Sequence, residues 1–218
     1  MSWRTLLYLP LGILPALFFT LRIFVQWIQS ERRKESFIGP LFWKLSLWGN
    51  ILLFCHHVIQ VQYPFALIQS VNALISWRNL DFLRPGPAYP RKVMLMLLVA
   101  AAVGTTLLFI MQSYFFIGEM DWIRTPQKLW NTERYYHNFF WHLFGTLGAA
   151  LFASRFWVQW WMAEFRLKSE PSPTFWYLSI IGSTLLLIYS LYIGDVIVVF
   201  YNCFSLIPYI RNLMLIKH

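Results

Sequence analysis

The chain has 218 residues, of which 58% are hydrophobic, 20% aromatic and only 12% charged, a composition that excludes an ordinary soluble domain. Its net charge of +9 would suit a nucleic-acid-binding protein, but the basic residues lie in alternate loops between apolar segments, so we expect no nucleic-acid partner. Two cysteines, Cys55 and Cys203, are too few for a disulfide framework.

Apolar segments follow one another along the chain, each near the roughly 20 residues that cross about 30 Å of hydrocarbon. They predict an all-helical (all-α) integral membrane protein with seven transmembrane helices near residues 5–29, 38–57, 62–80, 92–117, 138–162, 173–193 and 196–214. Arg4 precedes the first apolar stretch, as in a signal peptide. The length of this stretch, its Pro10 and Pro15, and the lack of a small-residue cleavage site predict a retained helix.

The charges of the loops predict the orientation of these spans. Eleven basic residues fall on one side of the membrane, namely Arg32, Arg33, Lys34, Arg78, Arg84, Arg91, Lys92, Arg166, Lys168, Arg211 and Lys217. The other side has only Arg4, Arg124, Lys128 and Arg134, diluted by Glu119, Asp121 and Glu133. By the positive-inside rule we expect the C-terminus in the cytoplasm, and the N-terminus and the loop at residues 118–137 outside.

An internal repeat organises the sequence, because a shift of 133 residues aligns residues 22–80 with 155–213 without a gap. The identical pairs include Arg22/Arg155, Gln26/Gln159, Trp27/Trp160, Glu31/Glu164, Ser36/Ser169, Pro40/Pro173, Phe42/Phe175, Trp43/Trp176, Ser46/Ser179, Gly49/Gly182, Arg78/Arg211 and Asn79/Asn212, and Phe19/Phe152 extends the match upstream. Hydrophobic composition alone would not match Arg, Gln, Glu, Ser, Pro and Asn at one offset.

Each copy contains three spans, so the second copy would be inverted unless the helix at residues 92–117 intervened. We therefore predict a first three-helix repeat at residues 1–80, a linker helix and outer loop at 81–137, and a second three-helix repeat at 138–218. The two repeats are then parallel, and a site built by such a pair usually lies on the pseudo-symmetry axis.

One block of motif residues, found in both copies, resembles the lipid A biosynthesis N-terminal domain. In the first copy the block comprises Arg22, Gln26, Trp27, Glu31, Ser36, Pro40, Phe42, Trp43, Ser46, Gly49, Arg78, Asn79 and Leu80. The resemblance implies a bacterial inner-membrane module found alone, near glycosyltransferases, or fused ahead of lipid-A-disaccharide synthase, notably in chlamydia-like bacteria. The order of three, one and three helices is also similar to SWEET and PQ-loop transporters. Neither repeat has a proline–glutamine pair in its first helix, so the transport chemistry of that group is not implied.

Arg22 and Gln26 lie four residues apart, as do Arg155 and Gln159, so each pair shares a helix face. An arginine inside a membrane costs roughly 2.5 kcal/mol or more and usually faces the bundle interior or a watery cavity. We predict that both arginines face a shared central cavity and bind the phosphate of a lipid-linked sugar, whose polar groups the glutamines recognise. The alternative is that each arginine snorkels to lipid phosphates at the cytoplasmic surface.

Further candidates lie on the second and third helices of each copy. Trp43 with Ser46 and Trp176 with Ser179 form two equivalent pairs. A sugar or lipid headgroup could stack on the tryptophan of each pair; the alternative is that these residues pack between helices. Two further pairs end the third helix of each copy, Arg78 with Asn79 and Arg211 with Asn212. They could contact anionic lipid or phosphate, or they could cap the helix end, and the two interpretations are equally good. Glu31 and Glu164 are expected to form salt bridges near the loops.

The sequence predicts no metal site, no cofactor and no catalytic residue. Cys55, His56 and His57 are adjacent, but no second cluster of ligands completes a four-coordinate site. The chain has no Gly-rich phosphate loop and no Ser/His/Asp arrangement.

We expect a module of lipid A and lipopolysaccharide biosynthesis that binds, presents or translocates a lipid-linked sugar or lipid A precursor for a cytoplasmic glycosyltransferase. Its N-terminus would be periplasmic and its C-terminus cytoplasmic, among the lipids of the inner membrane. One alternative is a SWEET-like sugar transporter, although Arg22 and Arg155 favour an anionic ligand over a free sugar. The other is a part of a lipid-A-disaccharide synthase enzyme, although no catalytic domain is evident.

Overall fold

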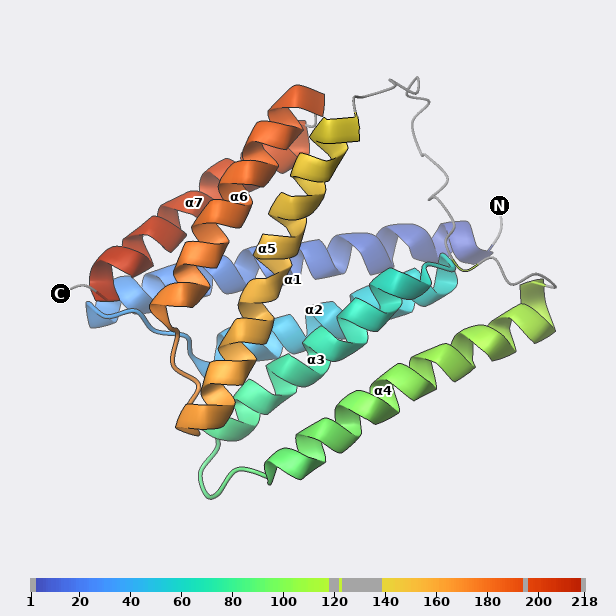
Figure 1. The fold of residues 1–218 in the computed structure, drawn as a ribbon, viewed down its shortest axis with the longest axis horizontal. Coiled ribbons are helices and arrows are strands. Elements are labelled where there is room, and N and C mark those ends of the chain that lie inside the picture. Colours follow the sequence, from blue (N-terminus) through green and yellow to red (C-terminus); the bar gives the residue numbers. More distant parts are fainter. Residues whose placement is uncertain (1–2, 118–121, 123–138, 194–195, 217–218) are drawn as a thin grey trace. The chain divides into compact units, whose positions relative to one another are not determined.

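The computed structural model describes residues 3–117, 122, 139–193 and 196–216 (Figure 1). Within these residues the chain is helical without any β-strand, which confirms the predicted all-helical class. The elements are α1 (Trp3–Arg33), α2 (Pro40–Ile59), α3 (Tyr63–Leu83), α4 (Arg91–Gln112), the π-helical turn η1 (Ser113–Ile117), α5 (Phe139–Arg166), α6 (Pro173–Ile193) and α7 (Val196–Ile216). Each predicted span coincides with one α-helix to within a few residues. The predicted outer loop at 118–137, apart from Trp122, lies outside the described residues.

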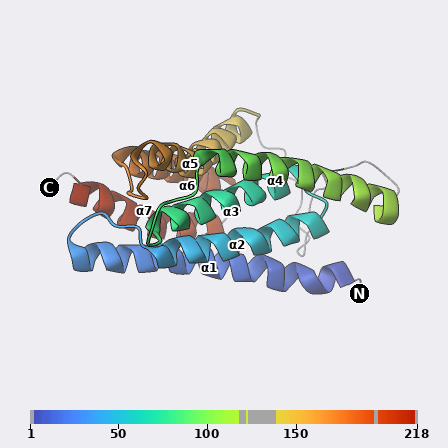
Figure 2. The same ribbon diagram turned by 90° about the horizontal axis from the view of Figure 1, so that it is seen from below.

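The helices form two compact units, and the boundary between them falls within α1. Unit 1 comprises residues 1–22 and 40–130, and therefore contains the first part of α1 with α2, α3 and α4. Unit 2 comprises residues 23–39 and 131–218, and contains the last part of α1 with α5, α6 and α7. In unit 1, α3 runs beside both α2 and α4 in both views (Figures 1 and 2). In unit 2, α6 packs against both α5 and α7.

The loops and helix starts of the two copies are built alike. Pro40 begins α2 and Pro173 begins α6, where the fixed φ of proline suits the first turn and its missing N–H is not needed. The chain leaves α1 through Lys34 and leaves α5 through Leu167, which is 133 residues further on. Both residues have a left-handed backbone, with φ of 57° and 52°. Positive φ values are uncommon for residues other than glycine. Their occurrence at both of these equivalent positions shows that the same turn recurs in both copies.

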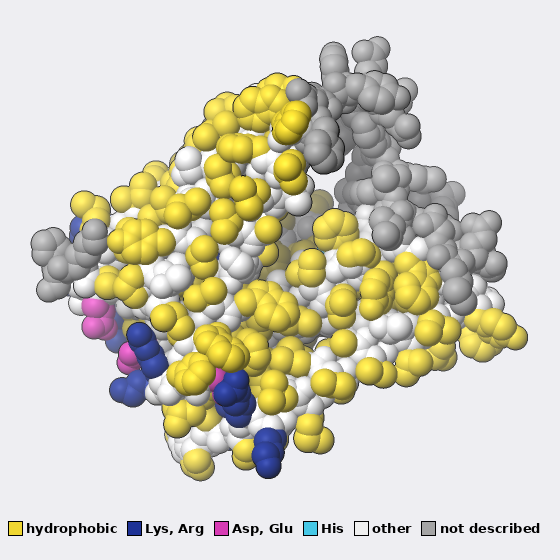
Figure 3. All heavy atoms as spheres, viewed as in Figure 1, with side chains coloured by type: hydrophobic (Ala, Val, Ile, Leu, Met, Phe, Trp, Pro, Cys, Tyr) yellow, Lys and Arg dark blue, Asp and Glu magenta, His cyan; other side chains and the backbone are white. Residues whose placement is uncertain are grey.

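Three helices of the described part are long and apolar enough to cross a membrane, and the segments concerned are Pro10–Arg33, Arg91–Phe115 and Pro173–Tyr192. Along α4, an exposed strip recurs every three or four residues at Met96, Val99, Val103 and Leu107, each more than half exposed. Hydrophobic side chains cover most of the visible helix faces, while charged side chains gather near helix ends (Figure 3). Surfaces of this kind suit lipid better than water.

The approach of α5 to α6 depends on glycine. A Cβ atom added to Gly182 of α6 would lie 2.7 Å from the backbone nitrogen and 2.8 Å from the Cα of Phe152 on α5. Gly148 on α5 faces α6 in the same way, since its added Cβ would lie 2.8 Å from the Cβ of Leu185. Small residues at both positions let the two backbones pack closely, as is common between membrane helices.

Replacing Gly182 with alanine should therefore lower the free energy of unfolding by about 1–3 kcal/mol, because backbone atoms of α5 cannot move aside as a side chain can. The matched control is Gly104→Ala on α4, where an added Cβ would meet nothing within 4 Å. Detergent unfolding followed by circular dichroism would measure both variants. Equal midpoints for the two would show that this close approach is not needed.

Candidate polar site in the helix interior

The arginine and glutamine pairs singled out from the sequence lie on buried helix faces. The exposed fractions of Arg22 and Gln26 on α1 are 6% and 1%, and those of Arg155 and Gln159 on α5 are 2% and 0%. A spacing of four residues is just over one helical turn, so each pair shares one buried face. This burial favours an internal role over the snorkelling alternative.

In unit 1, the Arg22 guanidinium lies between α1 and α2. Its Cζ is 4.4 Å from the centroid of the Phe19 ring and 5.3 Å from that of the Phe42 ring. Its Nη1 donates to the Ser46 Oγ at 2.9 Å, and the Ser46 hydroxyl donates to the Phe42 carbonyl at 2.8 Å. Ser46 therefore orients the cation, and the structure brings these two predicted site residues together.

In unit 2, the Arg155 guanidinium lies in a cage of aromatic rings. The Arg155 Cζ is 3.4 Å from the ring centroid of Phe152, 4.8 Å from that of Phe156, 5.4 Å from that of Tyr209 and 5.8 Å from that of Phe175. Its Nη1 donates to the Tyr209 hydroxyl at 3.4 Å. Arg155 forms no ion pair with any residue that the structure describes. The aromatic faces attract the cation, but they do not neutralise its charge.

Two polar atoms on this face of α5 have no hydrogen-bond partner among the described residues, the Arg155 Nε and the Gln159 Oε1. The Gln159 Nε2 donates to the Glu170 carbonyl at 2.9 Å, which leaves its carbonyl oxygen as the unused group. A buried polar atom without a partner costs about 1–3 kcal/mol unless a ligand or water satisfies it. A guanidinium N–H suits an anionic oxygen, and an amide oxygen suits a hydroxyl group.

Gln26, the counterpart of Gln159, has different partners. Its Oε1 accepts from the Asn212 Nδ2 at 3.2 Å, while its Nε2 donates to the Asn212 Oδ1 at 2.6 Å and to the Ser30 Oγ at 2.9 Å. This buried amide pair joins α1 to α7, so both side chains serve helix packing. Asn212 also donates to the Pro208 carbonyl at 2.7 Å, and in the first copy Asn79 donates to the Ile75 carbonyl at 2.9 Å.

The predicted tryptophan and serine pairs are also part of the interior. Trp43 and Trp176 are 0% and 1% exposed, so other side chains of the protein surround both indoles. The Trp176 Nε1 donates to the Ser36 Oγ at 2.9 Å, which ties α6 to the loop after α1. The Ser179 hydroxyl donates to the Phe175 carbonyl at 2.7 Å. These contacts favour the packing alternative for both pairs.

Arg78 lies in a buried ion-pair cluster at the end of α3. Arg78 and Asp81 are 1% and 4% exposed, and their side chains pair at 2.6 Å. Arg78 also donates to the Tyr89 carbonyl at 2.8 Å, and Asp81 accepts from the Tyr89 N–H at 2.9 Å and pairs with Arg84 at 2.7 Å. The cluster fastens the end of α3 to the loop before α4, which supports a helix-end role for Arg78.

Arg211, the counterpart of Arg78, has another carboxylate partner because the position equivalent to Asp81 is occupied by Met214. Arg211 instead forms two hydrogen bonds with Glu31 at the end of α1, one of them at 3.1 Å. Both side chains are about one-third exposed, at 38% and 33%. Glu31 thus has the expected salt bridge. An exposed pair of this kind contributes little to stability.

Sequence reasoning missed the cage residues Phe156 and Tyr209. Their counterparts in the first copy are Ile23 and Ser76, so the repeat gives no signal for them. It also missed Asp81, although the three-residue spacing of Arg78, Asp81 and Arg84 was a usable signal for ion pairing along a helix. Within the described residues, no three His, Cys, Asp or Glu side chains are grouped so that they could hold a metal ion.

Comparison with known proteins shows the family to which the repeated sequence belongs. The model of the "Lipid A Biosynthesis N-terminal domain" family matches residues 11–81 and again residues 144–214, two segments displaced by 144 − 11 = 133 residues. The lipid-A-disaccharide synthase of Chlamydia muridarum is 37% identical over 210 residues, which cover 96% of this chain and 34% of the relative. Those of Chlamydia felis and Chlamydia pneumoniae are 34% and 35% identical, with 95% and 96% of this chain and 33% of each relative covered.

The chain therefore spans about a third of the length of the curated relatives that it matches. No solved structure matches it.

Proposed function

Because the chain belongs to the lipid A biosynthesis N-terminal domain family, we propose that it is a membrane module that binds an anionic lipid-linked sugar and presents it to a glycosyltransferase. In this proposal all seven α-helices span the bacterial inner membrane, with the N-terminus periplasmic and the C-terminus cytoplasmic. The two family matches would be parallel three-helix repeats joined by α4. The sharing of one cavity by Arg22 and Arg155 stays a prediction.

The buried guanidinium of Arg155 carries this proposal. A cation that is 2% exposed and has no ion pair among the described residues is costly in an apolar interior, unless an anion binds there. Four aromatic rings exclude water from the guanidinium, which strengthens its attraction for a phosphate. The unused Nε of Arg155 would donate to a phosphate oxygen.

Gln159 would supply recognition of the sugar. Its unused Oε1 lies one helical turn beyond Arg155, where it could accept from a sugar hydroxyl while the phosphate occupies the guanidinium. A neutral sugar would leave the buried charge without a counterion, which is why we favour a sugar phosphate over the free sugar of a SWEET-like carrier. The acyl chains of the ligand would remain in the hydrocarbon of the membrane.

The relatives support the choice of partner. They are named lipid-A-disaccharide synthase, and this chain matches about one third of each. We assign the glycosyltransferase chemistry to a domain beyond the matched third, whether it is joined to this module or separate from it. The module's own contribution would be to bind and orient the lipid substrate at the membrane.

The proposal is tested by native mass spectrometry of the purified protein titrated with an acylated sugar phosphate and, separately, with the same acylated sugar lacking its phosphate. A charge-assisted hydrogen bond to the buried guanidinium contributes about 1.5–3 kcal/mol, so the phosphorylated probe should bind about 10- to 100-fold more tightly. Equal affinity for the two probes would contradict the proposal and favour a carrier of neutral sugars.

A further inference from the structure

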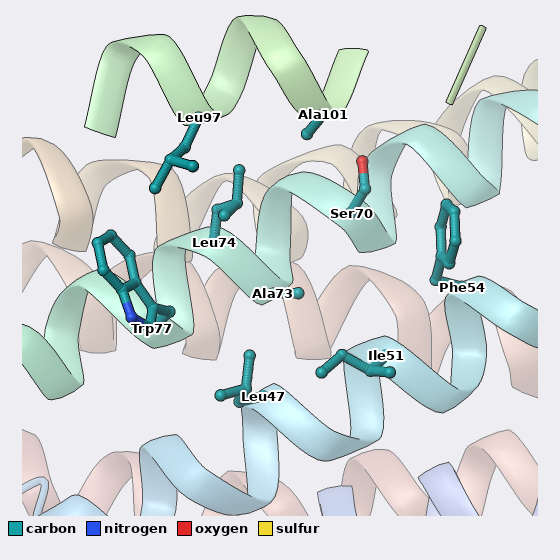
Figure 4. Close-up of a pocket in the computed structure, with 9 residues that line it drawn as sticks. All are labelled: Leu47, Ile51, Phe54, Ser70, Ala73, Leu74, Trp77, Leu97 and Ala101. Atoms are coloured by element: carbon teal, nitrogen blue, oxygen red, sulfur yellow. The ribbon is translucent and has the colours of Figure 1, made fainter. Parts of the chain in front are cut away.

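Unit 1 contains an apolar groove that is separate from the polar site. It has a volume of about 550 Å³ and lies among α2, α3 and α4 (Figure 4). Leu47, Ile51 and Phe54 form its α2 wall, at a spacing that places them on one helix face. From position 47 to position 54 this wall rises about 10 Å at 1.5 Å per residue.

The other walls show why the groove exists. Small side chains at Ala73 of α3 and Ala101 of α4 leave space where larger ones would fill the contact between the helices. The one hydroxyl in the lining, that of Ser70, donates to the Leu67 carbonyl at 2.8 Å, so it needs no other partner. Water would find almost no hydrogen-bonding groups here, whereas a hydrocarbon chain would have no polar group to leave unsatisfied.

An aromatic stack leads from this groove to a basic helix end. Trp77 lines the groove, and its ring stacks on Tyr89 with the centroids 5.9 Å apart and the planes inclined by 23°. The Arg84 guanidinium lies 4.2 Å from the centroid of the same Tyr89 ring. Asp81 is shared by Arg78 and Arg84, so this cluster keeps a net positive charge.

The start of α4 adds to the basic character of this end. Arg91 and Lys92 are both exposed there. Leu97, which lines the groove, follows Lys92 by five residues, or about 8 Å along the helix axis. Basic residues near a membrane surface attract anionic lipid. A lipid with one chain in the groove would therefore have its headgroup close to Arg84, Arg91 and Lys92.

We propose that unit 1 holds an anionic phospholipid, with one acyl chain in the groove among α2, α3 and α4 and its phosphate at the basic start of α4. The occupant is a lipid, because the lining is apolar and the charged end of the groove has the sign that anionic headgroups require. This site involves neither Arg155 nor Gln159, and it stands independently of the function proposed above.

The test uses photocrosslinking in nanodiscs. The probe is a phosphatidylglycerol with a diazirine on one acyl chain, and a phosphatidylcholine with the same chains provides the zwitterionic comparison. Mass spectrometry of the digested protein would locate the crosslinks. We expect crosslinks on the groove-lining segments of α2, α3 and α4, with a higher yield for phosphatidylglycerol. Replacing both Arg91 and Lys92 with glutamine should reduce that difference, since Arg84 remains.

Filling the groove should reduce the crosslinks strongly. Ala101→Phe inserts a ring from α4 and should lower the yield about tenfold, because the ring occupies the volume that the acyl chain needs. The matched control is Ala100→Phe, at the exposed neighbouring position, which should leave the yield unchanged. Ala73→Trp fills the same groove from α3 and serves if the first variant does not fold.

Unchanged crosslinking after the groove is filled, or equal yields from the two lipids in the groove segments, would overturn the inference. The result is separable from the proposed function, because Arg155→Lys should leave the groove crosslinks as they are. Weak binding of the acylated sugar phosphate would likewise say nothing against this site.

Discussion

Lysine in place of Arg155 should weaken binding of an acylated sugar phosphate by about 10- to 100-fold, because a lysine at this position keeps the charge but loses the planar array of donors. The Arg155 Nε is the donor that lacks a partner among the described residues, and lysine has no equivalent of it. Native mass spectrometry with the purified variant would measure the loss. The matched control is Arg166→Lys, an exposed arginine on the same helix, which should bind as the wild type does.

The stability of a second variant separates a ligand role from a structural one. Arg155→Leu removes a buried charge that has no carboxylate partner in the part of the chain described, so its melting temperature should equal or exceed that of the wild type. A residue kept for function at the expense of stability behaves in this way. A large loss of stability in Arg155→Leu, together with full binding by Arg155→Lys, would make this arginine a packing element.

Asparagine in place of Asp81 should lower the free energy of unfolding by about 3–5 kcal/mol, because it leaves the buried Arg78 without its carboxylate partner. Both side chains are buried, and Asp81 also pairs with Arg84 and accepts a hydrogen bond from the Tyr89 N–H. Detergent unfolding followed by circular dichroism is the measurement.

The matched control is Glu35→Gln, which removes the Arg33–Glu35 ion pair, whose side chains are 53% and 61% exposed. An exposed ion pair contributes only about 0–1 kcal/mol, so this variant should unfold close to the wild type. If Asp81→Asn were as stable as Glu35→Gln, the cluster at the end of α3 would not be an important part of the fold.

The helices were predictable because apolar runs of membrane length are long and distinct, and each predicted span coincides with one α-helix. The division into compact units was not. Its boundary falls within α1, and Gln26, on the unit 2 side of that boundary, bonds to Asn212 of α7, which is far away in the sequence. Periodicity within a helix shows which face is buried, but not which helix covers it.

The repeat made part of the site predictable, namely the residues that recur in both copies. Arg22, Arg155 and the glutamines stood out because polar residues are costly in a membrane and these recur at one offset. The repeat could not show that Gln26 has its amide oxygen occupied while Gln159 does not. That difference depends on partners on other helices. Tyr209 was not predicted as a cage residue for the same reason, since its contact with Arg155 depends on how α7 packs within unit 2.

Mass-spectrometric identification of the lipids that co-purify with the protein tests the central claim most directly. The wild-type protein and an Arg22→Leu/Arg155→Leu variant would be extracted from the same bacterial membranes and their bound lipids compared. We expect the wild type to carry a lipid that bears both a sugar and a phosphate, and the variant to carry bulk phospholipid without it. Recovery of the same sugar-bearing lipid in equal amount from the variant, or its absence from the wild type, would contradict the account.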